Sequence, residues 1–200
     1  MLSYIQGILT EKNPTYAVID CSGVGFLLFI SVNTYASLPE LNQKCKLHTH
    51  LTIKSEATTP VGLVMYGFSN VEERSIFLEL ISVSGIGSNT ARLILSSLTT
   101  TDVISAISNG DVHTFRNVKG IGEKTAQRII IDLRDRISKI PHSKEFFLPQ
   151  HNNIQNEALS ALIMLGFNKN TADKVVDKVI KNQGINISLE EMVKQALKLL

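Results

Sequence analysis

The chain has 200 residues, of which 44% are hydrophobic and 19% are charged, and its formal net charge is only +2. Such a chain can form one to three small globular domains, and its charge excludes a nucleic-acid binder that depends on bulk positive charge. No apolar run approaches the roughly 20 residues of a membrane span, and the N-terminus lacks a signal-peptide pattern, so we expect a cytoplasmic protein.

The first third of the chain is predicted to form strands. Five runs rich in β-branched and aromatic residues are bounded by turn-forming residues; they are 2–9, 15–20, 23–30, 46–53 and 62–68. Residues 31–41 leave room for one helical turn. Five strands with a short helix after the third predict a closed five-stranded β-barrel of the OB type. Cys21 and Cys45 are expected as reduced core residues rather than a disulfide.

After Gly67 the hydrophobic pattern takes the period of a helix. Residues 70–83 predict a helix with Asn70 as N-cap, residues 101–110 a short helix that ends at Gly110, and residues 123–139 a longer helix with a charged outer face. The middle of the chain is therefore predicted to be all-α.

A sequence repeat lies within this helical region. "VSGIGSNTA" at 83–91 matches "VKGIGEKTA" at 118–126, 35 residues later, in Val, Gly, Ile, Gly, Thr and Ala. Each copy follows a helical segment and precedes another helix. A duplicated helix, Gly-Ile-Gly turn and helix is far more specific than one Gly-x-Gly, which for a single copy is equally well a helix C-cap.

The repeat predicts a site for phosphates of a polymer backbone. Glycine permits positive φ and lets main-chain N–H groups approach an anion, and the helix that follows directs its positive end at the same oxygen. Ile86 and Ile121 are expected to pack inward. Such a site binds DNA with little base preference. The predicted DNA-binding residues are Gly85, Ile86, Gly87, Arg92, Lys119, Gly120, Ile121, Gly122, Lys124, Thr125 and Arg128, although each cation is equally compatible with a solvated surface charge.

Nucleotide binding and catalysis find little support. A Walker loop is excluded because Glu123 separates Gly122 from Lys124 and Asn117 occupies the position of the earlier glycine. His48 and His50 share a strand face, but no further ligands complete a metal set, so we predict no metal site, no cofactor and no catalytic residues.

The last part of the chain is predicted to form a linker and a small helical domain. Residues 140–153 contain two prolines and no sustained period. Three helices follow, and their expected core comprises Ala158, Leu162, Leu165, Ala172, Val175, Val176, Val179, Leu189, Met192, Val193, Ala196 and Leu197. The predicted domains are a barrel at 1–63, tandem hairpins at 64–140, a linker at 141–153 and a UBA-like three-helix domain at 154–200.

These motifs resemble the RuvA family of Holliday-junction-binding subunits. "GIGSNTARLIL" and "GIGEKTAQRII" are similar to helix-hairpin-helix motifs, and "MYGF" followed by "ERSIFLELISVSGIG" resembles the junction between the family's domains; "GVGF" and "EALSALIMLGF" extend the likeness over nearly the whole chain. The resemblance implies an α+β multidomain protein that acts in recombination, DNA repair and the SOS response to DNA damage. It implies a homotetramer or octamer on four-way junction DNA, with no membrane association.

The resemblance also implies partners. The C-terminal domain would bind RuvB, the ATPase motor, which would hydrolyse ATP in place of this non-catalytic chain, and the RuvC resolvase would join a resolving complex. The family carries an acidic pin in a barrel turn, here "KSEATTPVG". Where many relatives have two adjacent acids, this sequence has Ser55 and Glu56, and Ser88 and Asn89 replace a basic residue of the first hairpin.

Other hypotheses remain open at this point. Helix-hairpin-helix units also occur in structure-specific nucleases, for which metal-dependent junction cleavage by the purified chain would be the evidence. A protein-interaction adaptor without a DNA role would tolerate Gly85→Val combined with Gly120→Val. A junction-binding platform would lose DNA binding with these substitutions and keep its fold. It would also show a shallow dependence on salt, because main-chain contacts dominate.

Overall fold

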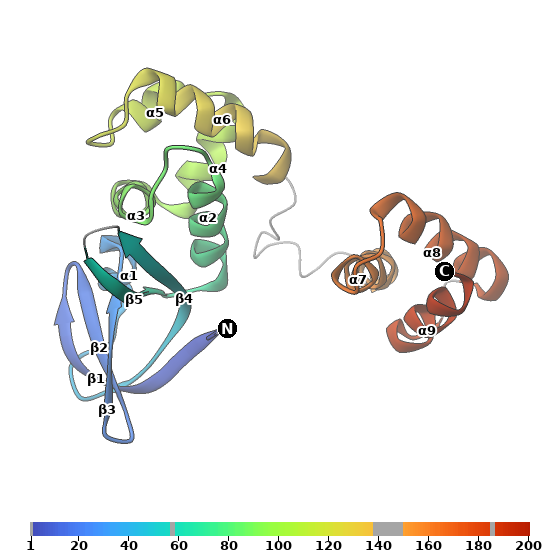
Figure 1. The fold of residues 1–200 in the computed structure, drawn as a ribbon, viewed down its shortest axis with the longest axis horizontal. Helices are drawn as coiled ribbons and strands as arrows, with labels where there is room; N and C mark the ends of the chain where they lie inside the picture. Colours follow the sequence, from blue (N-terminus) through green and yellow to red (C-terminus); the bar gives the residue numbers. More distant parts are fainter. Residues whose placement is uncertain (1, 57–58, 138–149, 185–186) are drawn as a thin grey trace. The chain divides into compact units, whose positions relative to one another are not determined.

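The computed structural model describes residues 2–56, 59–137, 150–184 and 187–200. The chain divides into two compact units, residues 1–142 and 143–200. The first unit contains a barrel and a group of helices, and the second contains helices (Figure 1). The described helices include none long and apolar enough to cross a bilayer.

Five strands close into a barrel in the order β1-β2-β3-β5-β4. They are β1 (Tyr4–Asn13), β2 (Tyr16–Cys21), β3 (Val24–Phe29), β4 (Lys44–Glu56) and β5 (Thr59–Phe68), with α1 (Val32–Ser37) after the third strand. All paired strands run antiparallel except β3 and β5, where Phe29 pairs with Tyr66 in parallel. The OB-type barrel predicted from the sequence is confirmed.

Side chains that alternate along the strands fill the barrel. Leu9, Ile19 and Leu28 are fully buried in it. Cys45 is buried as well, and burial raises the pKa of its thiol. Cys21 is half-buried, its thiol donates to the carbonyl of Gln6 at 3.2 Å, and both cysteines are free. The expectation of reduced core thiols therefore holds.

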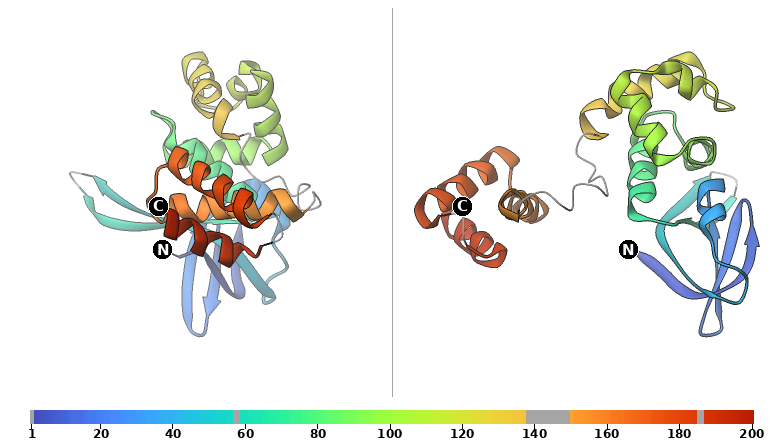
Figure 2. Two further views of the ribbon diagram at one scale, coloured as in Figure 1. Left: turned by 90° about the vertical axis from the view of Figure 1, so that its right-hand side faces the viewer. Right: turned by 180° about the vertical axis from the view of Figure 1, so that it is seen from behind.

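Strands β4 and β5 are longer than the alternating pattern predicts. The sequence predicts 46–53 and 62–68, but the pairing continues to Glu56 opposite Thr59, with a register shift between Lys54 and Glu56. Figure 2 shows this end of the hairpin extending beyond the other strands. Ile53 and Leu63, where this extension begins, are 65% and 71% exposed, so the strands have left the barrel core at that point. Residues 57–58 and the side chain of Glu56, where the acidic pin is predicted, lie outside the described part of the chain.

Helices complete the first unit. They are α2 (Val71–Ser82), α3 (Ser88–Ser97), α4 (Thr100–Asn109), α5 (Val112–Arg116) and α6 (Glu123–Ile137). Asn70 caps α2 as predicted, accepting from the Glu73 N–H at 2.8 Å. Helix α4 begins earlier than expected because Thr99 and Asp102 form a capping box there, and Gly110 ends it at φ 70°. The buried faces of these helices form one core with Tyr66 and Phe68 of the barrel.

The second unit consists of three helices around its own core. They are α7 (Gln150–Met164), α8 (Lys169–Gln183) and α9 (Leu189–Leu199). Ala158, Leu162, Val176 and Ala196 are fully buried, as expected, whereas Leu165 and Leu197, which were also expected in the core, are 59% and 43% exposed. The first turn of α7 occupies residues 150–153, which the sequence assigned to the linker. The rest of that linker, residues 141–149, lies outside the described residues.

Candidate nucleic-acid interface

The two Gly-Ile-Gly turns have the same backbone geometry. In the first, the N–H of Val83 donates to Leu80 and the N–H of Ile86 donates to Val83, at 3.1 and 3.0 Å. In the second, Val118 donates to Phe115 and Ile121 to Val118, both at 3.1 Å. The turns therefore repeat in space as they do in sequence.

One glycine in each turn has positive φ. Gly85 has φ 91° and Gly120 has φ 89°, a region that side chains other than glycine rarely adopt. A Cβ built on either would meet no heavy atom within 4 Å. Glycine is therefore required at these positions by backbone conformation rather than by crowding.

The second glycine of each turn begins a helix. Gly87 has extended dihedrals, φ −84° and ψ 167°, and no side chain caps α3. Its carbonyl accepts from Ala91 at 3.0 Å, and the carbonyl of Gly122 accepts from Ala126 at the same distance. The first N–H groups of a helix lack intrahelical acceptors, so each turn presents donors and a positive dipole end. Both glycines are exposed with open space around the Cβ position, which leaves room for an anion.

The isoleucine between the glycines anchors each turn. Ile86 is 5% exposed and Ile121 is 6% exposed, and both belong to the helical core. Their side chains pack inward, as the sequence predicts, which leaves only their main-chain atoms to face a ligand. An apolar side chain therefore anchors each turn in the core.

The predicted cations have different environments. Arg92 donates to the carbonyl of Thr15 at 2.9 Å and lies over the ring of Phe29, so it joins the hairpin to the barrel. Arg128 donates to the carbonyl of Ser84 at 3.3 Å, so it joins α6 to the first turn. Lys119 and Lys124 are exposed beside the second turn, and Thr125 is half-buried in the first turn of α6.

Sequence reasoning missed one charged partner at this surface. Arg116 of α5 pairs with Glu123 at 3.3 Å, and both side chains are more than half exposed. The carboxylate at the start of α6 therefore faces a guanidinium, which reduces its repulsion of a nearby phosphate. The pair spans the second turn from one helix to the other. The sequence gives little indication of this ion pair, because α5, which carries Arg116, has only five residues and shows no helical period.

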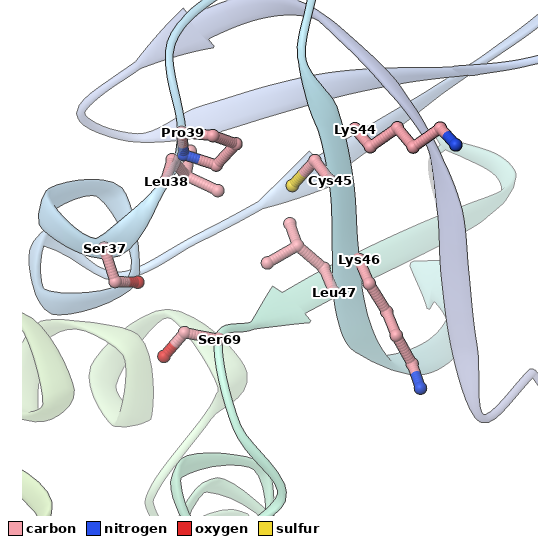
Figure 3. A pocket seen from close by; sticks show the side chains of 8 residues that line it. All are labelled: Ser37, Leu38, Pro39, Lys44, Cys45, Lys46, Leu47 and Ser69. Atoms are coloured by element: carbon pink, nitrogen blue, oxygen red, sulfur yellow. The ribbon is translucent and has the colours of Figure 1, made fainter.

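The barrel offers a cavity of a different kind. A pocket of about 370 Å³ lies between the end of α1 and β4 (Figure 3). Cys45 and Leu47 point toward Leu38, while the side chains of Lys44 and Lys46 extend away from it. The hydroxyl residues Ser37 and Ser69 also line this pocket. Across the described residues there is no group of three or more His, Cys, Asp or Glu side chains suited to a metal ion.

The barrel and the paired hairpins define a class of protein, the OB-type barrel followed by tandem helix-hairpin-helix units. Comparison with known sequences is consistent with this class. The family profile for the RuvA N-terminal domain matches residues 1–59, a SAM-like helix-hairpin-helix tandem matches 77–135, and the RuvA C-terminal domain matches 153–200. The chain belongs to the RuvA family.

Full-length relatives support the assignment. A protein of Christiangramia forsetii is 45% identical over 198 residues, covering 99% of both chains. A protein of Flavobacterium psychrophilum is 46% identical with the same coverage, and one of Cytophaga hutchinsonii is 42% identical over 204 residues, covering all of both chains. Each is named Holliday junction branch migration complex subunit RuvA.

The same substitution at two neighbouring glycines tests the geometry of the turns. We expect Gly85→Ser to lower the free energy of unfolding by about 1 kcal/mol, because serine is strained at positive φ. Gly87→Ser should change it by only a few tenths of a kcal/mol or stabilise the protein, since serine is a favoured N-cap. Urea unfolding of both variants measures the difference, and equal losses would contradict the described dihedral angles.

Proposed function

We propose that this chain is a non-catalytic DNA-binding subunit that holds a four-way Holliday junction for branch migration. The repeated hairpin geometry carries the proposal, because it would offer two phosphate sites made of main-chain groups within one compact unit. Family membership supplies the context, since relatives that match over the full length are named as branch-migration subunits. We further propose that it acts in the bacterial cytoplasm, where the DNA lies.

Each hairpin would bind the phosphates of a DNA strand through main-chain N–H groups of the protein. The N–H groups that follow Gly85 and Gly87 would meet one phosphate, and those that follow Gly120 and Gly122 another. The isoleucine of each turn contributes main-chain groups only, because its side chain is buried. Contacts of this kind position a protein on DNA without reading its sequence. Binding without sequence preference suits a four-way junction, which differs from linear duplex in the geometry of its arms.

Few side-chain cations support these contacts. Lys119, Lys124 and Thr125 lie beside the second turn and would contact phosphates directly. Arg128 and Arg92 each donate to a carbonyl group of the protein. We therefore assign Arg92 to fixing the hairpin on the barrel and Arg128 to fixing the two turns relative to each other.

The barrel would form the centre of a homotetramer, or of two tetramers as an octamer, that keeps the junction open and planar. The β4–β5 hairpin, which extends beyond the barrel, would carry Glu56 to the crossover as an acidic pin. A carboxylate near DNA repels phosphates, which favours separated strands. A single acid gives weaker repulsion than the pair found in many relatives.

The second unit would recruit the motor. Ile163, Met164 and Leu165 are 41%, 90% and 59% exposed at the end of α7, next to one another in the sequence. Exposed apolar residues that cluster in this way mark protein contacts. We propose that they dock on RuvB, which would hydrolyse ATP, and that RuvC joins when a junction is resolved.

An acidic substitution at the start of both hairpin helices should abolish DNA binding. Aspartate is a good N-cap, so Gly87→Asp with Gly122→Asp keeps the helices while its carboxylates occupy the phosphate sites. We expect junction affinity to fall about 100-fold or more from lost contacts and added repulsion. Fluorescence anisotropy with a labelled junction measures this. Gly87→Asn combined with Gly122→Asn is the neutral control and should lose less; unchanged binding by the aspartate variant would contradict the proposal.

The salt dependence of binding should distinguish the lysines proposed to contact phosphates, Lys119 and Lys124, from Arg92, which bonds a carbonyl group of the barrel. Replacing Lys119 and Lys124 with alanine should reduce the slope of log K against log salt by about 2 per subunit, since each phosphate contact contributes about 0.9. Arg92→Ala is the control, and it should leave the slope unchanged. Titrations between low and physiological salt provide the slopes. A larger effect of Arg92→Ala would show that this arginine contacts DNA.

Substitution of the exposed apolar residues in the second unit should disrupt motor recruitment alone. We expect Met164→Asp to weaken binding to purified RuvB at least about tenfold, because a charge enters an apolar contact. Junction affinity should not change. Leu199→Asp, at a residue 44% exposed on α9, is the matched control. Equal losses in both variants, measured by interferometry, would place the contact elsewhere.

A further inference from the structure

Glu73 of α2 is a buried carboxylate at the seam between the barrel and the hairpins. It is 3% exposed, and burial of a charged group is costly unless hydrogen bonds compensate. Its oxygens accept from the hydroxyls of Ser31, Thr34 and Ser69. The Thr34 bond is 2.6 Å and the Ser69 bond 3.3 Å. Two of the three partners belong to the start of α1, a barrel element far away in sequence.

The direction of these hydrogen bonds is fixed. Ser31 accepts from the Thr34 N–H at 2.9 Å, and Thr34 accepts from the Ser69 N–H at 3.1 Å. Each hydroxyl thus accepts one main-chain N–H and donates its own hydrogen to Glu73. A carboxylate, which only accepts, satisfies both. The network needs an acceptor here rather than a polar group in general.

Helix α1 also holds the other helix of the first hairpin. The side chain of Asn33 donates to the carbonyls of Leu95 and Leu98 at the end of α3, at 2.7 and 2.9 Å. The N–H of Val32 donates to the Ser96 hydroxyl at 3.1 Å. A helix of six residues thus bonds both helices of this hairpin.

Polar side chains line most of the seam beside Glu73. A pocket of about 220 Å³ lies there, lined by Asn33, Ser69, Asn70, Glu73, Leu95, Thr99 and Thr100. One turn further along the same face of α2, Phe77 packs against Tyr66 and Phe68, with ring centroids at 5.1 and 4.9 Å. Aromatic packing therefore holds the middle of α2 on the barrel, and the hydrogen bonds of Glu73 hold its first turn.

We propose that Ser31, Asn33, Thr34 and Glu73 form a clamp, the α1 clamp, that sets the angle of the hairpins to the barrel and so confers preference for a junction over a duplex. Glu73 and Asn33 are positioning residues in this scheme and do not touch DNA. A linear duplex needs only one hairpin pair, so its affinity does not depend on that angle. A junction needs several arms presented at fixed directions around the barrels. The inference rests on the proposed junction-binding function.

The test compares affinities of the full-length protein for a four-way junction and for linear duplex. In Glu73→Ala and in Asn33→Ala we expect the junction-to-duplex preference to fall about tenfold, with duplex affinity unchanged. The reason is that the loosened hairpins must be ordered when the protein binds a junction. Asn33 is exposed, so its variant keeps the fold even where Glu73→Ala does not. Glu73→Gln, which retains one acceptor oxygen, should recover part of the preference.

A destabilised control separates positioning from stability. Ile107→Val removes one methylene group from the fully buried side chain of α4, away from the clamp, and should leave the preference intact. If both clamp variants keep the wild-type preference, or lose junction and duplex affinity equally, the inference is overturned. A wild-type protein without junction preference would instead overturn the proposed function, and the inference with it.

Discussion

The position of the hairpins depends on how one phenylalanine seats α2 on the barrel. Phe77 is fully buried, and its ring lies 4.9 to 5.8 Å from those of Phe68, Tyr66 and His50. Aromatic groups at such separations gain edge and offset contacts in addition to the area that they bury. Burial and the nearby Arg74 lower the pKa of His50, so its ring packs here as the neutral form at pH 7. The barrel and the hairpins consequently share a core.

The anion sites proposed for the two turns would require little charge. In the proposed function, the net charge of only +2 and the bonding of Arg92 and Arg128 to carbonyl groups would leave most of the interaction to main-chain N–H groups at the starts of α3 and α6. Main-chain N–H groups differ from flexible lysine side chains in having fixed directions. Their directions are set by the fold, so under this proposal the angle between the two turns, and the angle between the turns and the barrel, would contribute to recognition of the DNA.

The sequence predicted what depends on local pattern. The barrel follows from strand alternation and turn residues, and the duplicated turns follow from six identical residues whose φ values and hydrogen bonds repeat. Helix α5 was missed because five residues show no period, although Asp111 caps it by accepting from the His113 and Thr114 N–H groups. The destinations of Arg92, Arg128 and Glu73 were not predictable, because their partners are distant in sequence and become neighbours only after folding.

The central claim is that the paired turns and the barrel recognise a branched DNA geometry. The most direct measurement is competition between a synthetic four-way junction and linear duplex of equal length for the purified protein, without nucleotide, at about 150 mM salt, where nonspecific charge binding is weakened. We predict a strong preference for the junction. Equal, weak binding to both would contradict the claim, because the hairpins would then hold DNA backbone without arranging arms.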